Sequence, residues 1–332
     1  MGPLVQLDPT ENASMGRQLS AIAANFASLA NAFAFGNSWY VNETTGNDGY
    51  PGTSPAQPFK TLTAALAAAT AANGDVIFLE GTVHLTATLN WNKNNVSLVG
   101  INGPSNNCRA RISAADTLTS AQATALAPLV NVTAVGCSFI NIGTFLAYAG
   151  ETPATAAVCW AEAGGRNYYN HVQFFGGGDA ATAALAGMRS LTIASDENEF
   201  QNCVIGLDTI QRTTAANMSL EFLSGSAARN IFRKCTFPCW SSIGTNGWVK
   251  FNANSGESYT LFEDCAFLNA VDWGPGTALA AGFFTPSTMN GAVLLKNCTT
   301  VGATAVSTTG PLYSASNAAI GAATSDIALK LT

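Results

Sequence analysis

The sequence predicts an all-β solenoid, a right-handed parallel β-helix with short N-terminal helices. Three observations predict it: a four-residue phrase recurs at a nearly constant interval, both of its ends are apolar, and a turn-forming residue separates them. The clearest copies are 200–203 (FQNC), 232–235 (FRKC), 262–265 (FEDC) and 295–298 (LKNC). Self-similarity at a period of 20–50 residues is typical of solenoids and arrays.

Two weaker copies precede these four. They lie at 134–137 (AVGC) and 169–172 (YNHV), where Val172 stands in place of cysteine. Counted from Cys137, the intervals between copies are 35, 31, 32, 30 and 33 residues. The repeat therefore extends over most of the second half of the chain.

The residue before each cysteine indicates a sharp bend. In an unbroken strand, side chains three positions apart point to opposite faces. A left-handed residue between them turns both apolar ends inward, and Gly136, Asn202, Asp264 and Asn297 are of the types that tolerate it, whereas His171 and Lys234 are not. Stacked coils then pair strands about 4.8 Å apart. The cysteines expected in one inward column are Cys137, Cys203, Cys235, Cys265 and Cys298.

The residue directly before each bend predicts which charges lie next to one another on the outer surface. This position holds Gln201, Arg233, Glu263 and Lys296 in successive copies, so Glu263 is expected between two cations. Such exposed pairs contribute about 0.2–1 kcal/mol each. Glu263 and Asp264 are therefore interpreted as surface residues and not as a catalytic pair.

Composition limits the possible partners. The chain has 332 residues, 48% hydrophobic and only 10% charged, with a net charge of −6 and an isoelectric point near 4.9. A negative, charge-poor surface argues against nucleic acid and against an anionic membrane as partners. A secretory signal and a membrane span are not apparent. The surface must consist largely of Thr, Ser, Asn, Gly and Ala, which suits stacked strands or a surface covered by other subunits.

The eight cysteines are expected to be free thiols. Five occupy the inward column, where a thiol behaves as a small hydrophobe. Disulfides are the alternative, but the absence of a secretory signal indicates a reducing site of synthesis. His84 and His171 are far apart, and no cysteine pair has zinc spacing, so neither a metal nor another cofactor is expected.

The first 36 residues read as an arm and a helix. Residues 1–18 are irregular and carry Leu4, Val5 and Leu7, which we expect to dock on a second surface. A stripe at steps of 3, 4, 3 and 4 follows, ended by Gly36. Its residues are Leu19, Ile22, Phe26, Leu29 and Phe33. Packing on the chain's own β-helix is the simpler interpretation; self-association is the other, and we favour it although two heptads are marginal alone.

The remaining segments follow in order. Residues 37–75 form a cap segment with a helix between Pro58 and Gly74, and residues 76–302 form the β-helix. Strands are expected at 75–81, 95–100, 191–193 and 218–222, and excursions between coils at 113–128 and 145–166. The tail, 303–332, is expected to cover the last coil, because an open strand edge templates aggregation.

A resemblance supports this fold. The segments YV at 40–41, GND at 46–48, PGT at 51–53, PFKT at 58–61, GD at 74–75 and NVSLVG at 95–100 resemble the opening of pectate-lyase-like right-handed β-helix proteins. The resemblance is clear over 39–103 and continues through the repeats to about 302. In that superfamily a helix caps the open end of the core, a role that would fall to Phe59, Leu62 and Leu66. The superfamily includes lyases, hydrolases, tailspikes and inert structural proteins, so the resemblance is specific for fold and not for function.

Catalytic residues are not apparent in the sequence. Glycoside hydrolysis needs two carboxylates about 5–9.5 Å apart, and the acids are scattered. The densest group, Asp196, Glu197 and Glu199, faces one arginine in the next copy and no further acid. Four tryptophans could form a carbohydrate-stacking surface or could simply pack: Trp160, Trp240, Trp248 and Trp273. We therefore expect no catalytic residue and no enzymatic activity.

In composition and layout the chain more narrowly resembles virion proteins of tailed bacteriophages. That resemblance implies a homotrimer, made in the host cytoplasm, which decorates and stabilises the capsid surface and has the major capsid protein as its partner. The alternative is a tailspike-like protein that binds or degrades bacterial surface polysaccharide. A cellular adhesin is a third interpretation, and it requires a secretion route.

Overall fold

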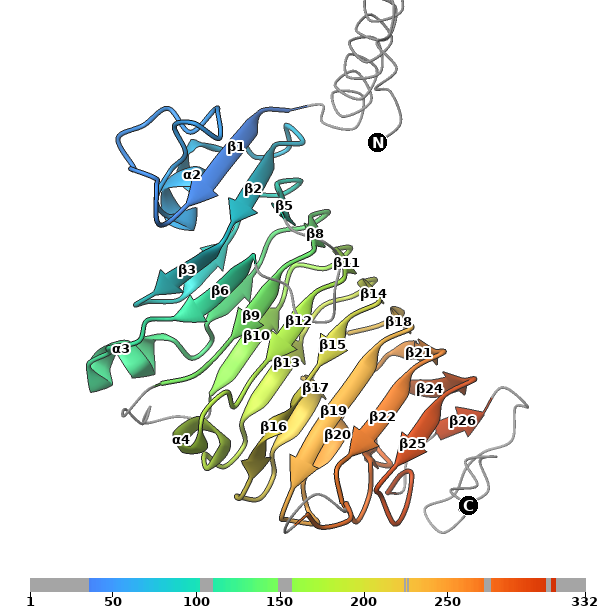
Figure 1. Cartoon of the computed structure of the whole chain (residues 1–332). Helices are drawn as coiled ribbons and strands as arrows, with labels where there is room; N and C mark the ends of the chain where they lie inside the picture. The colour runs from blue at the N-terminus through green and yellow to red at the C-terminus, as the bar shows by residue number, and fades with distance from the viewer. Residues whose placement is uncertain are drawn as a thin grey trace, which may run out of the picture.

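The chain winds into a parallel β-helix, which confirms the predicted fold class (Figure 1). The computed structural model describes residues 36–101, 110–148, 157–223, 225, 227–271, 276–308 and 312–314. Within them three parallel sheets run along the stack. Each coil passes from sheet 1 through a bend into sheet 2, crosses to sheet 3 and returns to sheet 1.

Ten strands form sheet 1 in the described part of the chain. In stacking order they are β1 (Ser38–Asn42), β2 (Val76–Glu80), β5 (Ser97–Gly100), β8 (Ser138–Ile140), β11 (Tyr168–Asn170), β14 (Glu199–Gln201), β18 (Asn230–Arg233), β21 (Ser258–Glu263), β24 (Gly291–Lys296) and β26 (Leu312–Ser314).

Sheet 2 contains nine described strands, one of which (β16) pairs beside the main path. They are β3 (Thr82–Leu85), β6 (Arg111–Ala114), β9 (Gly143–Phe145), β12 (Gln173–Phe175), β15 (Val204–Ile205), β16 (Leu207–Arg212), β19 (Thr236–Ser241), β22 (Ala266–Asn269) and β25 (Thr299–Val301). Sheet 3 contains seven: β4 (Leu89–Trp91), β7 (Val130–Val132), β10 (Val158–Glu162), β13 (Arg189–Ile193), β17 (Met218–Phe222), β20 (Gly247–Phe251) and β23 (Phe283–Phe284).

The three described helices are short. They are α2 (Leu62–Ala68), α3 (Ser120–Ala125) and α4 (Ala180–Ala183). Helix α2 is shorter than the predicted helix because the Thr61 side chain accepts a hydrogen bond from the amide of Ala64, and Ala69 is already extended. Leu62 and Leu66 are buried in the same core cluster as the first strands. Helix α2 therefore packs on the core at the first coil.

The bends between sheets 1 and 2 have the predicted left-handed backbone. Asn202, Asp264 and Asn297 have φ of 54°, 55° and 52°. His171 and Lys234 adopt the same conformation, with φ of 53° and 51°. The bend is thus a property of the coil, and it recurs where the residue type is unfavourable.

The first copy of the repeat was predicted in the wrong register. Tyr169 pairs with Phe139, so the bend of that coil is Asn141, with φ 55°, and Ile142 follows it. Cys137 precedes β8 and does not belong to the cysteine column. The interval from Ile142 to Val172 is 30 residues. The error arose because Gly136-Cys137 imitates the bend and cysteine of the later copies.

Aromatic rings fill the interior behind sheet 1. Phe139, Tyr169, Phe200, Phe232 and Phe262 stack in sequence, with ring centroids 5.0, 4.5, 4.6 and 4.8 Å apart. Stacked rings of this kind contribute about 0.5–1.5 kcal/mol per pair beyond their burial. The phenylalanine of the repeated phrase is therefore a core element.

Two predicted excursions contain solenoid strands. Strand β10 lies inside the segment 145–166, and β6 begins before the segment 113–128 and continues into it. Of the predicted C-terminal cap, residues 303–308 and 312–314 are described, and β26 adds a strand to sheet 1 beside β24. The division of the chain into four segments stays a prediction.

Candidate functional site

The predicted association and docking residues lie outside the described residues. They are Leu4, Val5 and Leu7 of the arm, and Leu19, Ile22, Phe26, Leu29 and Phe33 of the stripe. The contacts of these side chains stay predictions.

Four predicted column cysteines line the interior one coil apart. Cys203, Cys235 and Cys265 are at most 2% exposed, and Cys298 is partly exposed. Each thiol lies within hydrogen-bond distance of a carbonyl in the preceding coil; the Sγ of Cys235 is 3.4 Å from the oxygen of Phe200. Burial raises the pKa of Cys235 well above its ordinary value. These cysteines are packing residues.

Cys137 occupies a different internal stack. Its amide donates to the Oδ1 of Asn167 at 2.8 Å, the amide of Asn167 donates to Asn198, and the amide of Asn198 donates to Asn230. All three asparagines are buried. This asparagine ladder, Asn167–Asn198–Asn230, satisfies the backbone amides of Cys137, Asn167 and Asn198, where three successive coils enter sheet 1. Burial raises the pKa of Cys137 to about 11.

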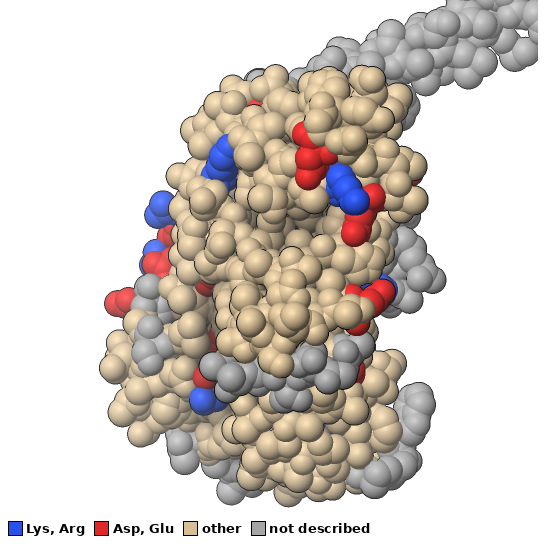
Figure 2. Space-filling model, turned by 90° about the vertical axis from the view of Figure 1, so that its left-hand side faces the viewer, with Lys and Arg blue, Asp and Glu red and all other residues tan. Residues whose placement is uncertain are grey.

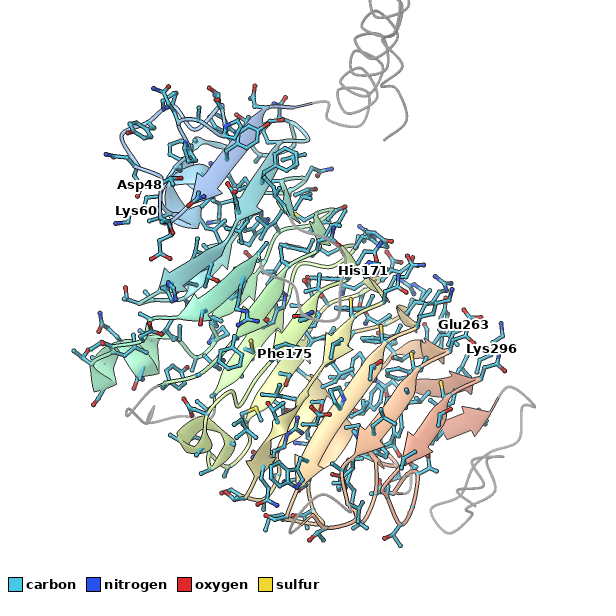
Figure 3. All side chains as sticks on the ribbon, viewed as in Figure 1. Asp48, Lys60, His171, Phe175, Glu263 and Lys296 are labelled. Atoms are coloured by element: carbon cyan, nitrogen blue, oxygen red, sulfur yellow. The ribbon has the colours of Figure 1, made fainter. Side chains whose placement is uncertain are left out.

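The outer row of sheet 1 carries the predicted charge ladder. Glu263 accepts from Arg233 Nε at 3.0 Å and from Lys296 Nζ at 2.5 Å. Hydrogen bonds from Lys296 and Arg233 lower the pKa of Glu263. Figure 3 places Glu263 and Lys296 together at the outer edge of the stack. The opposite charges of these side chains neutralise one another on an exposed surface.

The acidic side chains in the segment 196–199 do not converge on one point. Glu197 binds Arg166 and Arg229, each at 2.6 Å, and these hydrogen bonds lower its pKa. Glu199 pairs with Arg233, and Asp196 accepts the amide of Ala228. The three acids have separate partners, so the structure does not bring them together as a catalytic group.

The tryptophans do not form a shared surface in the described structure. Trp160 and Trp248 are 0% exposed within the core. Trp240 is partly exposed on β19, and Trp273 lies outside the described residues. Trp160 and Trp248 are therefore packing residues of the core.

Sheet 3 carries a charged cluster that sequence reasoning missed. Leu220 and Phe222 point into the core, so Glu221 between them faces outward. Glu221 pairs with Arg189 and, at 2.8 Å, with Lys250, and Asn252 donates to it at 2.9 Å. Burial opposes ionisation, but the two cations outweigh it and lower the pKa of Glu221. A carboxylate thus converges with Arg and Lys on one sheet face, and no second acid among the described residues is paired with it.

A buried carboxylate, Glu162, was also missed. It is 1% exposed and points inward at the end of β10. It accepts from the amides of Gly164 and Gly165, both at 2.9 Å, and from the side chains of Asn167, Ser195 and Tyr169. Burial raises the pKa of Glu162, and the hydrogen bonds from Tyr169 and Gly165 oppose that rise. The sequence did carry a signal for Glu162: this acid ends the apolar run 157–161 and directly precedes Ala163-Gly164-Gly165.

The outer face of sheet 2 is hollowed by a groove of about 440 Å³. Its floor is apolar, with Phe145 and Phe175 paired on neighbouring strands and Pro238 and Leu268 paired further along. Leu268 is 38% exposed. Figure 3 shows Phe175 on the broad side of the stack, away from the edge with Glu263.

Polar groups border this sheet 2 groove. The Arg111 guanidinium lies over the Phe145 ring, 5.5 Å from its centroid. Asp208, Thr209 and Thr236 also line the groove. Gly206 lies in its wall, where a Cβ would come within 2.4 Å of the Pro238 carbonyl oxygen. An apolar floor with a few polar groups at its border is typical of ligand sites, whose volumes run from about 300 to 1,000 Å³.

A second cavity, of about 330 Å³, lies where the cap segment meets the first coil. Glu43, Lys60 and His84 line it, and His84 Nδ1 lies 2.8 Å from Glu43 Oε2. Figure 3 shows Lys60 beside Asp48 on this side of the molecule. No group of three metal-ligating side chains occurs among the residues that the structure describes.

The described strands define the class by architecture: a right-handed parallel β-helix. No family model matches the sequence, and no curated protein matches it. Among solved structures, a rhamnogalacturonan lyase aligns with TM-score 0.56 and 13% identity over 84% of this chain and 73% of its own. Pectate lyase Pel9A aligns at 0.55 and 15%, over 81% and 64% of the two chains. Pectin methylesterase PemA from Erwinia chrysanthemi aligns at 0.51 and 16%, over 83% and 80%.

The expectation that the chain is not an enzyme is corrected by these matches. A pectin methylesterase and two lyases have the same fold, so the fold is one that polysaccharide-processing enzymes share. At 13–16% identity the likeness concerns the fold. The scarcity of acids was a poor basis for excluding catalysis, because Glu221, Arg189 and Lys250 meet only after folding.

A protein of Geobacillus virus E2, ORF18, aligns over 90% of this chain with TM-score 0.33 and 11% identity, and at that score it carries no argument. The described helices include none long and apolar enough to cross a membrane.

Proposed function

We propose that this protein binds a polysaccharide chain along the sheet 2 groove. The observation that carries the proposal is the paired Phe145 and Phe175 on the groove floor, with Arg111 and Asp208 at its border. Sugar rings present an apolar face that packs on flat aromatic groups and a rim of hydroxyls that needs hydrogen-bond partners. The groove offers both.

The groove also suits an elongated ligand. The outward row of sheet 2 continues from Phe145 and Phe175 to Pro238, Leu268 and Val301. Neighbouring strands are about 4.8 Å apart, so six strands from β9 to β25 provide about 24 Å of largely apolar surface along the axis. A linear polymer can contact several coils at once. The shared fold of polysaccharide-processing enzymes supports this class of ligand.

Titration calorimetry against a panel of linear polysaccharides, polygalacturonate and bacterial capsular polysaccharides included, tests the proposal. Phe175→Ala should weaken binding about fivefold to tenfold, since one aromatic contact contributes about 1–1.5 kcal/mol. Tyr50→Ala is the matched control, because Tyr50 is an aromatic residue of the cap segment that is 39% exposed and does not line the groove. Equal affinity of wild type and Phe175→Ala for every bound glycan would refute the groove.

A second candidate is decoration of a bacteriophage capsid by a homotrimer. The observation that favours it is the scarcity of charge: 10% of residues are charged. Figure 2 shows a side of the molecule with few blue and red groups. A charge-poor surface of small residues suits a protein packed among other subunits. The clamp on the capsid protein would be the arm with Leu4, Val5 and Leu7.

Capsid sedimentation separates the two candidates. Removal of residues 1–18 should leave a folded protein that no longer sediments with capsids, while glycan affinity is unchanged. Full occupancy of capsids by the shortened protein would rule out the arm as the clamp.

A further inference from the structure

The outer face of sheet 1 changes character along the stack. One continuous outward row begins with Tyr40, Phe78, Val99 and Ile140 on β1, β2, β5 and β8. The same row continues with polar and charged residues, namely Asn170, Gln201, Arg233, Glu263 and Lys296. The first four strands therefore present an apolar face where later strands present a solvated one.

We call the apolar part the sheet 1 patch: Tyr40, Val76, Phe78, Val99, Ile101 and Ile140. All six are at least partly exposed, and Ile101 is 47% exposed. Tyr40 and Phe78 stack with ring centroids 5.3 Å apart. Contiguous exposed apolar side chains of this kind mark interaction surfaces.

Residues 36 and 37, which follow the stripe in the sequence, are held beside this patch. The amide of Asn37 donates to Asp75 Oδ1 at 2.7 Å, and Gly36 fits so closely that a Cβ would come within 2.4 Å of the same atom. Residues 36 and 37 are thus fixed at the start of sheet 1, directly before β1. The stripe ends at Phe33, three residues earlier.

Each of the two apolar features is short. Four strands about 4.8 Å apart span about 14 Å. As a helix, residues 19–33 would span about 21 Å, at 1.5 Å per residue. Two heptads are marginal alone, and a sheet face of four strands is a small interface alone. Each alone is a weak contact, and only residues 34–39 separate the two in the sequence.

We propose that the sheet 1 patch is the contact between copies of this chain, arranged side by side in the same direction. The occupant of the patch is the same patch on a second copy, and the stripes of the copies meet directly beyond it. Parallel alignment follows because only that arrangement lets patch and stripe find partners together, and closed cyclic symmetry satisfies every copy. The charged part of the row, from Asn170 onward, lies beyond the proposed contact.

Sedimentation velocity on the full-length protein tests the contact. The wild type should sediment at a multiple of 34.2 kDa. Val99→Asp with Ile140→Asp should lower the association constant at least about tenfold, because carboxylates would be buried without partners. The matched control is Asn170→Asp with Gln201→Asp, in the same row beyond the patch, and it should leave association unchanged. Far-UV circular dichroism establishes that each variant folds.

A crosslinking arm avoids dependence on the folding of the aspartate pair. A short bis-maleimide should join copies of Val99→Cys and should join Gln201→Cys no more than it joins the wild type. A monomeric wild type, or an aspartate pair that associates as wild type does, overturns the proposal. So does a monomer whose residues 19–33 are protected from hydrogen exchange and lose that protection in the aspartate pair, because the stripe would then cover its own patch.

Discussion

Glu162 is a carboxylate enclosed by hydrogen-bond donors in a core that is otherwise largely apolar. Ionisation is opposed by burial and favoured by the donated hydrogen bonds, and burial is the larger effect, so the pKa is raised. A group whose pKa is raised in the folded state keeps its proton after the unfolded chain has lost it. The free energy of unfolding that it contributes is therefore fully present below the ordinary value of 4.5 and declines as the pH rises above it.

Glu162→Gln should remove this pH dependence. The variant cannot ionise, so the difference in unfolding free energy, wild type minus variant, should fall as the pH is raised from 4 towards neutrality, by about 1.4 kcal/mol for each unit by which the folded pKa exceeds the unfolded one. Urea unfolding at a series of pH values measures it. A difference that grows with pH would mean that the donors dominate and that the pKa is lowered.

Single residues also limited the sequence prediction. Gly136-Cys137 imitated a repeat copy, and only the pairing of Tyr169 with Phe139 shows that Asn141 and Ile142 hold the true positions. Conversely, the cation–Glu263–cation ladder was predictable, because residues at equal positions in adjacent copies become neighbours. A local pattern predicts contacts well where the period is constant and poorly where it changes.

At the scale of elements, the asparagine ladder connects successive coils where they enter sheet 1. Asn198 accepts the amide of Asn167 and donates its own amide to Asn230. Its side-chain nitrogen donates to Ser195 and Asn230. The ladder thus links three coils through buried polar groups that have no access to water.

Asn198→Ala should destabilise the protein by about 1–3 kcal/mol, because it leaves the buried amide of Asn167 without an acceptor. Asn131→Ala is the control: Asn131 donates to Asn90 on the exposed face of sheet 3, and its loss should cost no more than about 0.5 kcal/mol. Denaturant unfolding compares them. Equal losses of unfolding free energy in the two variants would show that water replaces the hydrogen bonds that Asn198 makes.

Elements between the repeats were harder to predict than the repeats. Strand β10 was assigned to an excursion because its residues, 158–162, carry neither the phrase nor an alternating pattern. Cys159 and Trp160 are both fully buried, so polarity does not alternate there. The sheet 2 groove was unpredictable for a related reason: Arg111, Phe145, Phe175 and Asp208 are separated by 30 residues or more and share no motif.

The whole molecule depends on closure of its first coil. A solenoid has a core that is open at each end, and here Phe59, Leu62 and Leu66 cover one end. Each coil stabilises its neighbours, so a defect at the end spreads inward.

Leu66→Asp should therefore lower the unfolding free energy by more than about 3 kcal/mol, through lost packing and a carboxylate placed in the core. Ala67→Asp, on the exposed side of α2, should change it by no more than about 0.5 kcal/mol. Light scattering should rise only for Leu66→Asp, since strand edges of an opened coil pair with other molecules. A stable Leu66→Asp variant would mean that the first coil does not need α2.

The regularly spaced cysteines make the local opening of single coils measurable. Cys203, Cys235, Cys265 and Cys298 each belong to a different coil and are spaced regularly along the axis. A thiol reagent can react with the three buried ones only when their own coils open, so these three labelling rates measure opening coil by coil. Cys298, the only partly exposed member of the four, should react first. The order of the remaining three would show whether the stack opens from its last coil inward or from the middle outward.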